Sequence, residues 1–142
     1  MNVLRFFFGC IYIIGGIANI VVTMVSPSIY MDFTDTAFIP FYKHFLIEYF
    51  YYNIPAFTIP AAFYQITIGL LIICKDIFVK IGLVGAVIFS LLIIPLGQEQ
   101  LPNIIFVAFM IYLLRKNYHY SFIDLIRHSI GINSGQTYHS EN

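Results

Sequence analysis

The chain has 142 residues, of which 60% are hydrophobic and only 10% are charged, and its formal net charge is zero. Soluble domains carry about 25% charged residues, so this composition excludes an ordinary water-facing surface and indicates a single domain embedded in lipid. The lack of net positive charge argues against nucleic acid as a partner.

The first predicted element is a transmembrane helix over Phe6–Val25. Its 20 residues contain no charged side chain, and roughly 20 apolar residues suffice to cross a bilayer. A cleaved signal peptide is the alternative, but the apolar stretch is longer than the roughly 7–15 residues of a signal-peptide core, and no Ala-x-Ala site follows it. Arg5 is expected to anchor this helix at the lipid headgroups.

The connection Ser26–Asn53 is too long to be a plain loop. Its second half, Phe41–Tyr52, contains seven Phe and Tyr residues. Because aromatic side chains concentrate at headgroup depth, this segment is predicted to be a helix that lies along the membrane surface.

Three further apolar helices are predicted after this connection. Residues 75–78 form a tight turn, which makes the second and third spans antiparallel neighbours. The last span is short, but Arg115 and Lys116 can snorkel at its end, and residues 98–100 can supply a first polar turn. The three spans are predicted at about Ala56–Cys74, Val79–Leu96 and Leu101–Leu114.

Residues 1–116 are therefore predicted to form an all-α, membrane-embedded four-helix antiparallel bundle, with an interfacial helix between the first two spans. Residues 117–131 are expected to form a cytoplasmic amphipathic helix, and residues 132–142 a disordered tail. With four spans, six of the seven basic residues lie on one side of the membrane, with only Lys43 on the other. The positive-inside rule then places both termini in the cytoplasm, in a multi-pass protein of the cell membrane.

Small and polar residues recur at helical spacing and predict the inward faces of the bundle. The first helix has the longest such stripe, and the second and third have shorter ones. The stripes are Arg5, Gly9, Tyr12, Gly16, Asn19 and Thr23; Thr58, Ala62, Gln65 and Gly69; and Gly82, Ala86 and Ser90.

Several polar residues of these helices fall in the outer half of the bundle or at its outer boundary, where polar groups indicate a functional site. Hydrogen bonding between helices is the other interpretation. Uncharged amides and hydroxyls suit a neutral ligand with carbonyl or hydroxyl groups, such as a quinone or a lipid head. The candidate ligand-binding residues are Asn19, Thr23, Gln65, Glu99 and Asn103, with His44 and Glu48 capping them from the interfacial helix.

No catalytic residue and no metal site is predicted. His44 and Glu48 are two groups at helical spacing, which falls short of a metal site. Cys10 and Cys74 have no metal-type spacing and no Cys-x-x-Cys motif, so they are expected to be buried, inert thiols rather than a redox pair. A quinone is the one cofactor that the polar residues would suit.

Four segments together carry a family resemblance. The first helix contains Arg5-Phe-Phe-Phe-Gly9 and then Gly15-Gly16-Ile-Ala-Asn19, and the long connection follows. The second helix ends in Gln65-Ile-Thr-Ile-Gly69-Leu-Leu-Ile-Ile, and Asn103 begins an aromatic and aliphatic run to Arg115. This pattern resembles the DoxX-like family of small four-helix membrane proteins over roughly Arg5–Lys116.

The resemblance implies a four-helix membrane fold. It also implies a link to quinone-coupled oxidation as an accessory subunit, and hence a redox-protein partner. The family often has an acid at the position of Gln65, so the case for a proton-linked role is weakened here.

Three classes of function are left. The first is a non-catalytic membrane subunit or small-molecule binder, accessory to a membrane redox system. The second is a membrane enzyme that acts on a lipid-soluble substrate. The third is a small transporter, which would need a homo-oligomer because four short helices make a thin transport pathway and no inverted repeat is present. The first class is favoured, because the second would normally show a perturbed acid, base or metal inside the bundle.

Overall fold

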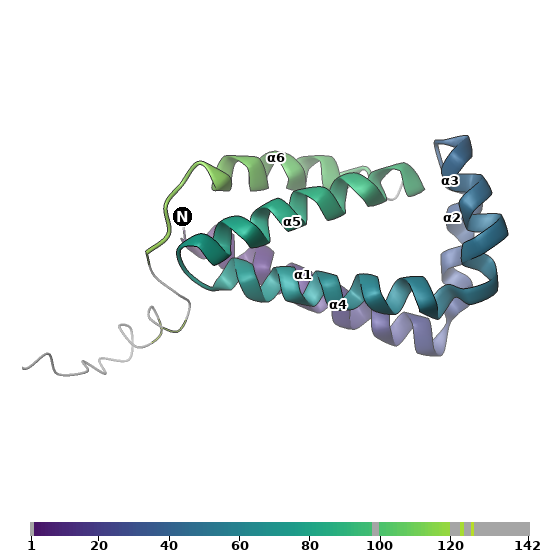
Figure 1. Ribbon diagram of the computed structural model, residues 1–142, viewed down its shortest axis with the longest axis horizontal. Coiled ribbons are helices and arrows are strands. Elements are labelled where there is room, and N and C mark those ends of the chain that lie inside the picture. Colours follow the sequence, from purple (N-terminus) through teal and green to yellow (C-terminus); the bar gives the residue numbers. More distant parts are fainter. Residues whose placement is uncertain (1, 98–99, 120–122, 124–125, 127–142) are drawn as a thin grey trace, which may run out of the picture.

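The structure is a computed structural model that describes residues 2–97, 100–119, 123 and 126, and these residues form helices and turns without a β-strand (Figure 1). The predicted all-α class is therefore confirmed for this part of the chain. The predicted tail 132–142, most of the predicted helix 117–131 and the candidate residue Glu99 lie outside the described residues.

The four predicted apolar helices are present, close to their predicted bounds. Proline occupies the first turn of α4 and of α6, where its missing N–H would have no helical partner. Pro60 lies inside α4. The four helices are α1 Asn2–Val25, α4 Ile54–Ile73, α5 Ile77–Ile93 and α6 Pro102–Leu114.

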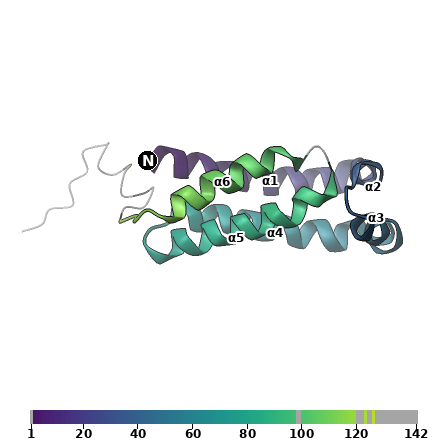
Figure 2. The same cartoon turned by 90° about the horizontal axis from the view of Figure 1, so that it is seen from above.

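The long connection after α1 is folded into short helical segments. These segments lie across the ends of α1 and α4, at the opposite end of the molecule from the N-terminus (Figures 1 and 2). The predicted aromatic helix Phe41–Tyr52 corresponds to α3, the single π-helical turn η2 and the short 3-10 helix η3, which lead directly into α4. In order, the segments are η1 Pro27–Met31, α2 Asp32–Thr36, α3 Pro40–Phe45, η2 Leu46–Phe50 and η3 Tyr51–Asn53. A further 3-10 turn, η4, extends α5 over Ile94–Leu96.

Within the described residues, three helical stretches are long and apolar enough to cross a membrane. They are Val3–Val25, Pro40–Ile73 and Ile77–Leu96, and α6 is a shorter apolar helix. Large apolar side chains also cover the outside of the molecule: on α1, Ile14 and Met24 are 66% and 72% exposed. An apolar exterior of this extent fits lipid and not water, so the chain is a membrane protein.

The helices pack in the order α1 on α4, α4 on α5, and α5 on α6. Glycines bring the backbones of α1 and α4 into direct contact. A Cβ atom at Gly16 would lie 2.7 Å from the carbonyl oxygen of Ala62, and one at Gly69 would lie 2.7 Å from the carbonyl oxygen of Gly9. Residues of the three predicted inward stripes are buried or half-buried in the structure, which confirms those stripes.

The apolar core lies between these four helices and includes Phe8, Ile72, Leu83 and Met110. The hydroxyl of Tyr12 makes polar contacts across it. The hydroxyl of Tyr12 on α1 lies 2.7 Å from Ser90 Oγ on α5 and donates to the carbonyl oxygen of Ala86 at 3.1 Å. These groups satisfy one another in a region that water cannot reach, and they join α1 to α5.

The expectation for Arg5 is wrong, because this side chain is fully buried in the protein. Its guanidinium lies 4.4 Å from the ring centre of Phe6 and 4.7 Å from that of Tyr118, which follows α6. Tyr118 is held in turn by its carbonyl oxygen, which accepts a 2.7 Å hydrogen bond from the backbone N–H of Asp76. Burial raises the pKa of Tyr118, so the ring stays neutral at neutral pH.

The expectation that both cysteines are buried is also wrong. Cys10 is exposed on the outside of α1 and Cys74 is half-buried at the end of α4, and both are free thiols. A cysteine is apolar enough to face lipid, so its burial in protein does not follow from an apolar sequence context.

Candidate functional site

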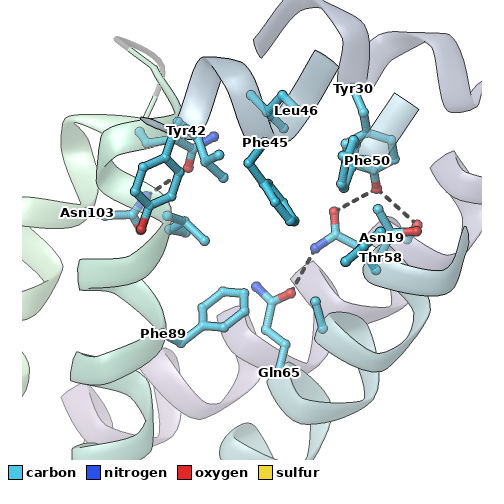
Figure 3. A pocket seen from close by; sticks show the side chains of 15 residues that line it. Asn19, Tyr30, Tyr42, Phe45, Leu46, Phe50, Thr58, Gln65, Phe89 and Asn103 are labelled. Carbon is cyan, nitrogen blue, oxygen red and sulfur yellow. Dashed lines mark hydrogen bonds between the residues drawn. The ribbon is translucent and has the colours of Figure 1, made fainter. Parts of the chain in front are cut away.

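A cavity of about 390 Å³ lies where η1, α3 and η2 meet the long helices, and Figure 3 shows the side chains that line it. Its walls come from α1, η1, α3, η2, α4, α5, η4 and α6, so it is formed only when these elements pack together. Its volume falls within the roughly 300–1,000 Å³ of small-molecule sites.

The cavity has aromatic walls with a few polar groups, and no charged side chain lines it among the described residues. The aromatic lining residues are Tyr30, Tyr42, Phe45, Phe50, Phe57 and Phe89. The polar lining residues are Asn19, Thr58, Gln65, Gln100 and Asn103. Such a site offers ring faces for stacking and amides or hydroxyls for hydrogen bonds to a neutral molecule.

Asn19 and Gln65, predicted from different helices, meet at the wall of the cavity. Asn19 Nδ2 donates a hydrogen bond of 2.8 Å to Gln65 Oε1. The hydroxyl of Tyr30, from η1, donates to Asn19 Oδ1 at 3.1 Å. These three side chains form a chain of hydrogen bonds that Figure 3 shows beside the open space.

Thr23 belongs to the same polar network but does not line the cavity. Its hydroxyl lies behind Asn19, donates to the carbonyl oxygen of Asn19 at 2.7 Å, and lies 2.8 Å from Thr58 Oγ1 on α4. Thr23 is 4% exposed, so its main contribution is to hold α1 against α4.

Asn103 lies on the other side of the cavity, in the first turn of α6 (Figure 3). Its Nδ2 donates to Gln100 Oε1 at 3.0 Å, and both residues line the cavity. The site therefore has two amide pairs: Asn19 with Gln65 on one wall, and Asn103 with Gln100 on the other. Gln100 was not singled out in the sequence because residues 98–100 were assigned to a polar helix start.

His44 and Glu48 do not line the cavity. They form an exposed contact one helical turn apart, with 3.0 Å between His44 Nε2 and Glu48 Oε2. The same segment turns Tyr42, Phe45 and Leu46 toward the cavity instead. The aromatic side of this segment faces the apolar cavity, and its polar side faces away from it.

The aromatic residues are the part of the site that the sequence did not identify. Phe57 is the centre of a cluster: its ring centre lies 5.3 Å from that of Phe45 and 5.7 Å from that of Phe50. Phe89, from α5, also lines the cavity, and its ring centre lies 5.9 Å from that of Tyr64. The spacing of Tyr42, Phe45 and Leu46, which all line the cavity, was a usable signal, because residues three and four apart share one helical face.

Comparisons with family models, with curated proteins and with solved structures find no match for this chain. The features of this chain that bear on its function are therefore the geometry of the cavity and the membrane character of the helices.

Proposed function

We propose that this membrane protein binds a neutral, lipid-soluble molecule that contains a ring and a carbonyl or hydroxyl group, such as a quinone or a quinone-like lipid. In this proposal it is a non-catalytic subunit, accessory to a membrane redox system with a redox-protein partner. The resemblance to the DoxX-like family is part of the same proposal and favours the quinone within the ligand class.

The observation that carries the proposal is the lining of the cavity. Amide groups from Asn19, Gln65 and Asn103 are set in aromatic walls, with no charge among the described lining residues. A permanent ion would lack a counter-charge in such a site, whereas a ring with polar substituents finds both stacking surfaces and hydrogen-bond partners.

The proposal includes a membrane arrangement. The four helices form an antiparallel bundle with α6 as the fourth span, and both termini are cytoplasmic. The segment from Pro40 to Asn53 lies along the outer interface, which the exposed rings of Phe41 and Tyr52 support, because aromatic side chains favour headgroup depth. A ligand that dissolves in the bilayer then reaches the cavity from the outer half of the membrane.

The test is equilibrium binding of tetramethyl-1,4-benzoquinone to the protein in nanodiscs. The fully substituted ring does not add to the free thiols of Cys10 and Cys74. Saturable binding is expected for the natural protein, and Gln65→Leu is expected to weaken it about 2- to 10-fold, the value of one hydrogen bond.

Thr67→Val is the matched control. Thr67 lies two residues from Gln65 on α4, but it is exposed, and its hydroxyl donates to the carbonyl oxygen of Phe63 in its own helix. This variant is expected to bind like the natural protein. Uptake that does not saturate and is the same for all three proteins would mean simple partitioning into lipid, and the proposal would fail.

A further inference from the structure

The amide of Gln65 has a defined orientation at the cavity wall. Its oxygen, Oε1, accepts the hydrogen bond from Asn19 Nδ2. Its nitrogen, Nε2, lies on the side of Phe89, away from Asn19 (Figure 3). Among the described residues, Nε2 donates no hydrogen bond, although Gln65 lines the cavity. The wall therefore presents an N–H donor at this point.

The neighbouring Asn19, which Tyr30 and Thr23 contact, has the amide orientation that matches this polarity. The backbone oxygen of Asn19 already accepts from the hydroxyl of Thr23 at 2.7 Å. The Tyr30 hydroxyl lies 3.1 Å from Asn19 Oδ1 and 3.2 Å from the backbone oxygen of Asn19. In the structure the side-chain oxygen of Asn19 faces Tyr30, and its nitrogen donates to Gln65 Oε1. The opposite arrangement of both amides would turn Gln65 Oε1 toward the cavity.

Gly15 makes room for the Gln65 amide against α1. A Cβ atom at this position would lie 2.9 Å from Gln65 Nε2 and would push the nitrogen away. The close approach places the donor against the helix at the cavity wall, so its position is set by α1 as well as by α4.

We propose that the cavity selects a ligand that accepts a hydrogen bond at Gln65 Nε2, and hence a ring carbonyl over a ring hydroxyl. This inference rests on the proposed function and narrows its ligand class to the oxidised, quinone form. A carbonyl oxygen is a good acceptor for an amide N–H, whereas the oxygen of a ring hydroxyl is a weaker acceptor and carries a proton of its own. In the opposite arrangement of the amides, the preference would reverse.

The test compares the oxidised and reduced forms of one ring, tetramethyl-1,4-benzoquinone and tetramethylhydroquinone, in nanodiscs without oxygen. The natural protein is expected to bind the quinone about 2- to 10-fold more tightly than the hydroquinone, the effect of one hydrogen bond. Gln65→Met keeps the length of the side chain and removes the donor, so it is expected to abolish this preference. Thr67→Val is expected to retain it.

The outcomes separate the two proposals. Equal affinity for both ligands, or tighter binding of the hydroquinone, would overturn the selectivity inference while the cavity remained a ligand site. Saturable binding of neither ligand would overturn the proposed function and the inference together. Even if Gln65→Met does not fold, the relative affinity of the natural protein for the quinone and the hydroquinone tests the selectivity inference.

Discussion

Asn19 on α1 and Gln65 on α4 are 46 residues apart in the chain, and their side chains share a hydrogen bond of 2.8 Å at the wall of the cavity. The sequence offered two interpretations of these polar residues, bonding between helices or a ligand pocket. The structure combines the two, because the same amides that join the helices also line an open space. The effect of a substitution here must therefore be measured both on stability and on binding.

The contact between α1 and α4 at Gly16 is expected to tolerate no larger side chain. Gly16→Leu should lower the free energy of unfolding by roughly 1–3 kcal/mol, because the added atoms overlap the backbone of α4. A Cβ alone would lie 2.6 Å from a side-chain atom of Ile66 and 2.7 Å from the Ala62 carbonyl oxygen. Thermal unfolding in detergent measures the change. Ala18→Leu, on the exposed side of the same helix, should have little effect, and equal melting temperatures for the two variants would contradict the packing described here.

The hydrogen bond between Tyr12 and Ser90 is expected to couple α1 to α5. In a double-mutant cycle with Tyr12→Phe and Ser90→Ala, a coupling energy of about 0.5–1.5 kcal/mol is expected, since each single variant breaks the same 2.7 Å contact. Denaturant unfolding in mixed micelles gives the four free energies of unfolding. Strictly additive effects would mean that the contact contributes nothing to the stability of the bundle.

The ring of Tyr118, and not its hydroxyl, is expected to be the group that stabilises the buried Arg5. Tyr118→Phe keeps the ring over the guanidinium and loses only the hydrogen bond to the carbonyl oxygen of Leu113, at 3.1 Å. Tyr118→Leu removes the ring and should cost about 0.5–2 kcal/mol more, the range of a cation–π contact. Thermal unfolding of the two variants in parallel checks the difference. Equal losses would mean that the hydroxyl, and not the ring, accounts for the effect.

The membrane arrangement predicts opposite accessibility for the two ends of the bundle. In a background with Cys10→Ser and Cys74→Ser, a cysteine placed at Ser28 should react with a membrane-impermeant maleimide in intact cells. A cysteine placed at Asn117 should react only after the cells are permeabilised, because the basic residues favour the cytoplasm for that end. Both positions are exposed in the structure, so reactivity reports the side of the membrane. The reverse pattern would invert the topology.

The long apolar helices and their inward stripes could be predicted from the sequence, because length and spacing alone determine them. Twenty uncharged residues define α1, and glycines at helical spacing identify the face that meets α4. The pairing of Asn19 with Gln65 followed from their similar depth in helices that pack together. These are local or one-dimensional signals, and they do not depend on how the chain turns between helices.

The features that could not be predicted from the sequence depend on how the chain turns between the helices. The side of the aromatic segment that faces the bundle was assigned to His44 and Glu48, whereas Tyr42 and Phe45 line the cavity. The angle at which α3 and η2 cross the ends of the long helices determines which side of the segment faces the bundle. The burial of Arg5 could not be foreseen either, since its partner Tyr118 lies 113 positions away and is placed by the N–H of Asp76.

Photo-crosslinking with an azido derivative of a methylated benzoquinone in native-like membranes tests the central claim, that the cavity binds such a ring, most directly. Mass spectrometry of the digested protein locates the adducts. Adducts are expected on the segments 42–50 and 57–65, which carry most of the aromatic lining. Unlabelled tetramethyl-1,4-benzoquinone is expected to compete with the probe and to reduce these adducts. Adducts spread over exposed side chains such as Ile14 and Val21, without competition, would contradict the claim.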